Sequence, residues 1–171
     1  MQLQIEHLPK LKIINFYIKN LLNDSILLLK PDTPNSPQLA KNIFAYGNIE
    51  YCLITSDLMA VKYLSEDMEN LRLLVMAELE DFLAQPQDLS ALRGEENVLD
   101  LAQAVADSYI RPTLNRDNGN IDISDYSEGI LSIKFSGHCA DCPFAQNTFN
   151  NVIIKTFNRF IPKIREVRLI K

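Results

Sequence analysis

Apolar and polar residues alternate in short blocks along this chain, and two polar breaks interrupt the blocks. The first break, residues 30–37, contains three prolines and predicts a loop. The second, residues 86–97, is mostly polar, includes Pro86 and Gly94, and predicts a linker. The pattern therefore predicts an α+β protein of two small domains, residues 1–85 and 98–171, joined by that linker.

The strand patterns of the first domain form two pairs. They cover residues 12–18 and 25–30, then residues 50–55 and 58–63. Each run is rich in aliphatic, β-branched and aromatic side chains, and polar residues of the kind found in tight turns separate the members of a pair. We therefore expect one hairpin that turns at Asn23 and Asp24, and a second that turns at Ser56 and Asp57.

Two helix patterns complete the first domain. Apolar residues recur at helical spacing from Pro37 to residue 46, with Ser36 as the expected N-cap and Gly47 as the stop. Residues 68–83 carry the broad apolar stripe of an amphipathic helix. The first domain is thus a small α+β unit with little that suggests chemistry.

The second domain has the predicted order helix, strand, strand, helix, strand. The elements are expected over residues 98–110, 120–124, 130–135, 149–161 and 164–170. Pro112 is expected to end or kink the first helix, and Pro162 to break the second. A strand–helix–strand connection within one sheet returns its last strand parallel to an earlier one, so a parallel final strand is expected.

The charge and the apolar runs exclude several classes of function. The chain has 171 residues and a formal net charge of −5, so nucleic acid is not expected as a partner. No apolar run is long enough to span a bilayer, and the first residues lack the pattern of a secretory signal. We therefore expect a cytoplasmic location without membrane contact, where cysteines act as thiols, metal ligands or redox groups.

The candidate chemistry lies at Cys139 and Cys142. They form a C-x-x-C on the loop between a predicted strand and a predicted helix, a spacing found in zinc sites, iron–sulfur clusters and dithiol redox sites. Cys52 is interpreted as a small buried apolar residue, and His138 as a neighbour of the motif that is either solvated or in contact with a ligand residue. Because zinc sites and iron–sulfur clusters need about four ligands, two chains sharing one cluster would complete the set.

Several stretches of the second half resemble the C-terminal domain of NifU, the core of the Nfu-type iron–sulfur proteins. They are residues 110–114, 117–121, 129–131, 135–143 and 160–167. The first half is similar to the N-terminal domain of two-domain Nfu proteins, over residues 36–44 and 56–61. The family's Asp-Gly-Gly-Asp turn corresponds here to residues 117–120, which read Asp-Asn-Gly-Asn. His138 and Asp141 replace small residues that are common in the family around the cysteines.

The resemblance implies a non-enzymatic scaffold or carrier. Such a protein binds a cluster, usually a [4Fe–4S], between two subunits and delivers it to apo-proteins after receiving it from upstream assembly machinery. Cys139 and Cys142 match the two ligand cysteines. Our own expectation for the first domain is an interaction role, in partner docking or in dimer positioning. Two other interpretations of the motif stay open: a dithiol–disulfide oxidoreductase, in which Cys139 attacks and Cys142 resolves, and a zinc-stabilised interaction module.

Overall fold

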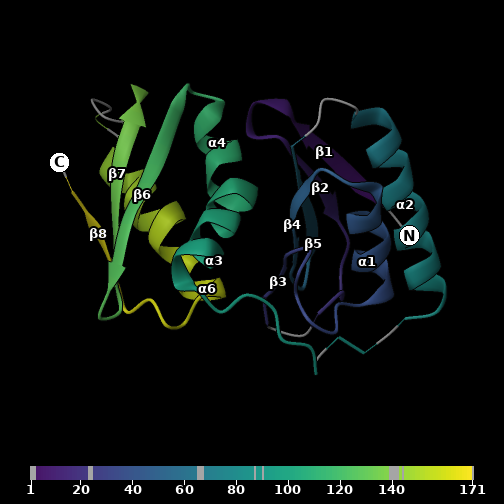
Figure 1. Cartoon of the computed structure of the whole chain (residues 1–171). Helices are drawn as coiled ribbons and strands as arrows, with labels where there is room; N and C mark the ends of the chain where they lie inside the picture. Colours follow the sequence, from purple (N-terminus) through teal and green to yellow (C-terminus); the bar gives the residue numbers. More distant parts are fainter. Residues whose placement is uncertain are drawn as a thin grey trace. The chain divides into compact units, whose positions relative to one another are not determined.

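The chain forms two compact units, Met1–Glu95 and Glu96–Lys171, in a computed structural model (Figure 1). The structure describes residues 3–22, 25–64, 68–86, 88–89, 91–138, 143 and 145–170. Both units combine helices with a sheet, which confirms the α+β class. Among these described residues, no helix is long and apolar enough to cross a membrane.

The first unit is built on an antiparallel five-stranded sheet in the order β1-β2-β5-β4-β3. The strands are β1 (Gln4–Leu8), β2 (Ile13–Tyr17), β3 (Leu27–Leu29), β4 (Ile49–Ile54) and β5 (Leu58–Tyr63), with a 3-10 turn, η1, at Pro9–Leu11. Helices α1 (Gln38–Tyr46) and α2 (Met68–Ala84) lie on one face of this sheet (Figure 1). The predicted strand pair at residues 50–63 is confirmed as the β4–β5 hairpin.

The core of the first unit lies between this sheet and its helices. On β5, Met59, Val61 and Tyr63 are separated by one residue each, so their side chains lie on the same face of the strand and enter the core. On α2, Leu71, Val75, Leu79 and Phe82 recur at helical spacing and are also buried in it. The apolar stripe predicted for residues 68–83 is therefore confirmed as the buried side of α2.

Three details of the first unit differ from the sequence prediction. The hairpin expected from residues 12–30 is wrong, because β2 pairs with β1 and β5 while β3 pairs with β4. Leu21 and Leu22, which follow β2, are buried in the core. Asn23 and Asp24, where the turn was expected, lie outside the described residues. Strand β1 was not predicted. Ser36 is not the N-cap of α1; Pro37 occupies that position, and the Ser36 hydroxyl donates to the Thr33 carbonyl at 2.9 Å.

Much of the predicted linker packs on the first unit. Leu89 is buried in its core, and the Glu95 amide donates to the Leu28 carbonyl of β3 at 2.7 Å. The Lys30 ammonium lies 3.1 Å from the Glu95 carboxylate. Residues up to Glu95 therefore belong to the first unit, and the boundary between the units falls near the end of the predicted linker.

The second unit has a three-stranded sheet in the order β6-β7-β8, with helices on one face (Figure 1). Its elements are α3 (Val98–Val105), the π-helical segment η2 (Ala106–Ile110), α4 (Arg111–Asn115), β6 (Gly119–Ser127), β7 (Ile130–Gly137), α5 (Ala145–Thr148), the π-helical segment η4 (Phe149–Ile154), α6 (Lys155–Phe160) and β8 (Glu166–Leu169). Strands β6 and β7 are antiparallel, whereas β8 runs parallel to β7. The parallel final strand is thus confirmed.

The first helix of this unit begins as predicted and ends later. Asn97 caps α3, since its side-chain oxygen accepts from the amides of Leu99 and Asp100. Pro112 does not end the helix, which continues to Asn115. Proline has no amide hydrogen, so the regular hydrogen-bond pattern cannot pass unchanged through residue 112. The π-helical segment η2 ends at Ile110, directly before α4, so the helical hydrogen-bond pattern changes close to Pro112.

Candidate functional site

The predicted ligands Cys139 and Cys142 lie outside the described residues. The structure does describe the segments that lead into and out of the motif. Strand β7 and His138 precede it, and Pro143 and helix α5 flank its far side. These segments determine how the motif is anchored to the second unit.

The entry to the motif is fixed by backbone contacts. At the end of β7, Gly137 pairs with Gly119 at the start of β6. The next amide, that of His138, donates to the Asn118 carbonyl at 3.1 Å. Gly137 has a φ of +62°, and a side-chain carbon added to it would meet the same Asn118 oxygen well inside van der Waals contact. Only glycine meets both requirements at this position.

The turn whose Asn118 carbonyl accepts the His138 amide follows directly after α4. The Asp117 amide donates to the Leu114 carbonyl at 3.0 Å, and the Asn118 amide donates to the Asn115 carbonyl at 3.2 Å. Asn118 has a φ of +54°, a left-handed conformation that asparagine adopts more readily than most residues. The turn therefore tolerates Asn-Gly where the resembling family has Gly-Gly.

Arg111 holds the beginning of β6, directly after this turn, from inside the unit. Its side chain is 10% exposed, and one guanidinium nitrogen lies 2.6 Å from Asp107 Oδ1. The same group donates to the Ile121 carbonyl at 3.0 Å and to Gln103 Oε1 at 3.0 Å. It also donates to Asn120 Oδ1 at 3.1 Å. A buried guanidinium is tolerated because several acceptors surround it.

These contacts form one continuous support for the motif. Arg111 links the first helix of the unit to the beginning of β6, and the turn before β6 holds Gly137 and His138. We did not single out Arg111 as a site residue from the sequence. The signal was present, since Asp107 stands four residues earlier and places its carboxylate on the same side of the helix.

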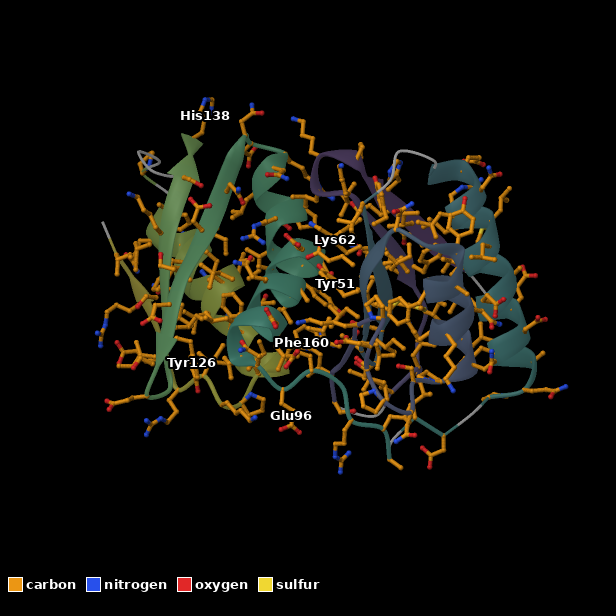
Figure 2. The ribbon with its side chains drawn as sticks, in the orientation of Figure 1. Tyr51, Lys62, Glu96, Tyr126, His138 and Phe160 are labelled. Carbon is orange, nitrogen blue, oxygen red and sulfur yellow. The ribbon has the colours of Figure 1, made fainter. Side chains whose placement is uncertain are left out.

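On the exit side, the helix that follows the motif is anchored by apolar side chains. Phe149, Ile153 and Phe157 are buried, whereas Pro143 is exposed. His138 is also exposed, and Figure 2 shows its side chain at the end of β7, directed away from the sheet. The exposed position of His138 fits the solvated alternative.

Cys52 differs from the motif cysteines in position and chemistry. It lies on β4 in the core of the first unit, fully buried, which confirms its interpretation as a small apolar residue. Burial raises the pKa of the Cys52 thiol, and a metal ligand must be a thiolate. Within the described part of the chain, no cluster of three or more His, Cys, Asp or Glu side chains is arranged to hold a metal ion.

Part of the second unit matches a known protein family. Residues 103–168 match the NifU-like domain family. This range runs from α3 to β8, and it contains Arg111, the turn at Asn118 and both motif cysteines.

Similarity to curated proteins extends over most of the chain. A protein of Drosophila erecta named NFU1 iron-sulfur cluster scaffold homolog, mitochondrial, is 25% identical over 146 residues, which is 79% of this chain and 52% of the relative. The Homo sapiens protein of the same name is 24% identical over 140 residues, or 75% of this chain and 55% of the relative. The chain thus spans about half the length of the curated relatives it matches. Their names place them in mitochondria, and our expectation of a cytoplasmic location stays a prediction.

Proposed function

We propose that this chain, whose residues 103–168 form a NifU-like domain related to the Nfu-type scaffolds, carries an iron–sulfur cluster on Cys139 and Cys142 and passes it to apo-proteins. The observation that supports this most is the position of the C-x-x-C inside the NifU-like domain, while the third cysteine is buried in the other unit. The role is that of a carrier and not of an enzyme.

The ligand count favours a cluster shared by two chains. Iron–sulfur clusters are usually held by four cysteine thiolates, and one chain supplies two at the motif. Cys52 is buried with a raised thiol pKa, and the His7 side chain contacts Tyr63 within the first unit at 3.1 Å. A second copy supplies the missing pair, so the loaded form is a homodimer. Four thiolates can hold either a [2Fe–2S] or a [4Fe–4S] cluster, and the resemblance to Nfu-type proteins favours the [4Fe–4S] form.

Residues on both sides of the motif anchor it to the second unit. Arg111, the turn at Asn118 and Gly137 hold the entry to the motif, and the buried face of the following helix holds the exit. Anchors on both sides reduce the conformational freedom lost when the four thiolates are brought together. Upstream assembly machinery supplies the cluster, and apo iron–sulfur proteins receive it.

Anaerobic reconstitution with iron and sulfide tests the proposal. We expect a brown dimer with about four irons per two chains, measured by visible absorption, iron analysis and gel filtration. Cys139→Ala and Cys142→Ala should abolish loading. Cys52→Ala, the matched control, should keep it.

Two outcomes would overturn the proposal. Loss of the cluster in Cys52→Ala would contradict the ligand count. A colourless monomer that reduces disulfides through Cys139 and Cys142 would replace the carrier by a dithiol–disulfide oxidoreductase.

A further inference from the structure

The segment that follows the motif contains no acidic residue. Residues 143–165 include Lys155, Arg159, Lys163 and Arg165 but not one Asp or Glu, in a chain with 22 acidic residues and a net charge of −5. The helix formed by α5, η4 and α6 lies within this segment. A long acid-free stretch in an acidic protein marks a surface of distinct charge.

The exposed side of this helix combines amides with cations. Phe149, Ile153, Phe157 and Phe160 are buried, and the polar residues between them are exposed except for the half-buried Thr156. The exposed set, called here the amide–cation face, consists of Gln146, Asn147, Asn150, Asn151, Lys155, Asn158 and Arg159. Lys155 donates to Asn151 Oδ1 at 3.2 Å, and the Arg159 guanidinium lies 4.5 Å from the ring centre of Phe160, which is labelled in Figure 2.

We propose that the amide–cation face docks an acidic surface of the protein that receives the cluster. This inference rests on the proposed function and names the chemistry of the partner. A recipient must bring its own cysteine thiolates to the motif, and carboxylates on the carrier would repel thiolates and acidic neighbours alike. Cations on this face attract such a surface, while the amides hydrogen-bond to it without adding charge.

The opposite face of the second unit's sheet carries a different arrangement of charges. On β7, the exposed Lys134 alternates with the buried Ile133 and Phe135, so it lies on the face of the sheet opposite the helices. On the neighbouring strand β6, Asp122 is its cross-strand partner and is also exposed. A cation on that face stands beside a carboxylate, whereas Lys155 stands beside amides.

The test measures docking separately from cluster binding. Fluorescence anisotropy of a labelled acidic apo-ferredoxin, titrated with the full chain free of cluster, reports docking at low and at physiological salt. We expect Lys155→Glu to weaken binding about fivefold to tenfold at low salt, with a smaller effect as salt screens the charges. Asn151→Asp should weaken it about threefold. Lys134→Glu, the matched control for charge, should change it by less than about twofold.

The outcomes separate this inference from the proposed function. Equal weakening by Lys155→Glu and Lys134→Glu would show a net-charge effect and overturn the inference. Salt-sensitive self-association, or binding of a short RNA, that Lys155→Glu abolishes while ferredoxin binding is unchanged would assign the face to a second copy or to nucleic acid, and would also overturn it. Failure of reconstitution in the unmodified chain would overturn the proposed function alone, because the docking measurement needs no cluster.

Discussion

The carbonyl oxygen of Asn118 lies against the Cα atom of Gly137, in the space where any other residue would carry its side chain. Both residues have left-handed backbone conformations, with φ of +54° at Asn118 and +62° at Gly137. The same oxygen accepts the amide of His138, the residue before Cys139. Close backbone approach, and not side-chain packing, therefore defines the entry to the candidate cluster site.

Gly137→Ala is expected to reduce both stability and cluster loading. The left-handed φ costs a non-glycine residue about 1–2 kcal/mol, and the added methyl group must also push Asn118 away. We therefore expect a loss of about 2–3 kcal/mol in the free energy of unfolding by urea, together with fewer irons per chain after reconstitution.

Gly47→Ala is the matched control for this substitution. Gly47 has a φ of +92° with open space around it, and it lies after α1 in the first unit. Alanine there should lower stability through the backbone alone and leave the iron content unchanged. If both variants loaded iron equally well, the contact between Gly137 and Asn118 would have no part in cluster binding.

Arg111→Lys is expected to weaken the support beneath the turn. Lysine keeps the charge, but it cannot reach Asp107, Gln103 and the Ile121 carbonyl at once, so buried acceptors lose their donors. We expect a loss of about 2–4 kcal/mol in unfolding free energy. Amide hydrogen exchange should rise at His138, whose bond to Asn118 depends on the turn.

Arg168→Lys provides the comparison for that variant. Arg168 lies 2.9 Å from Glu166 on the exposed strand β8, where an ion pair contributes about 1 kcal/mol or less. Its substitution should leave exchange at His138 unchanged. Equal exchange in the two variants would show that Arg111 does not support the motif.

The helices and the second unit could be predicted from sequence because their signals are local. The apolar stripe of α2 and the parallel return of β8 follow from periodicity and from the geometry of a strand–helix–strand connection. The C-x-x-C was found in the same way, because its two cysteines are close in the chain. The contacts that hold the entry to the motif were not predicted, because the contact of Gly137 with Asn118 joins residues that are far apart in the chain.

The prediction that β2 pairs with β3 was wrong because strand pairing is also a tertiary relationship. Two strand-like runs close in sequence favour a hairpin, but Leu21 and Leu22 gain more by entering the core than a tight turn would allow. Burial across the unit therefore overrides the local preference, and β3 pairs with β4. In the edge strand β1, Gln4, Glu6 and His7 weaken the apolar pattern, which is why the strand was missed.

Cys52 should make the free energy of unfolding decrease as the pH rises in the alkaline range. Burial raises the pKa of its thiol in the folded state, whereas in the unfolded chain the thiol ionises near pH 8.5. The unfolded state thus loses a proton that the folded state keeps, so the free energy of unfolding falls above about pH 8.5, by up to about 1.4 kcal/mol per pH unit. Below that pH the contribution is fully present.

Urea unfolding of the wild type and of Cys52→Ala between about pH 7.5 and pH 9.5 measures this contribution. The difference between the two chains should shrink as the pH rises, because the variant lacks the titrating thiol. Parallel curves would contradict the buried, neutral thiol. Thiol labelling of the folded protein gives a second measurement, in which Cys52 should react only after unfolding.

Gly94→Ala is expected to release the end of the first unit. A side-chain carbon at Gly94 would collide with the Leu28 carbonyl oxygen, which accepts the Glu95 amide at 2.7 Å. We expect a loss of about 1–2 kcal/mol in unfolding free energy and faster tryptic cleavage after Arg93. Lys30→Met, the control, removes the half-buried ion pair with Glu95 while leaving the backbone at residue 94 unchanged, and should cost about 1 kcal/mol or less. Unchanged cleavage in Gly94→Ala would mean that the backbone contact with β3 does not hold this segment in place.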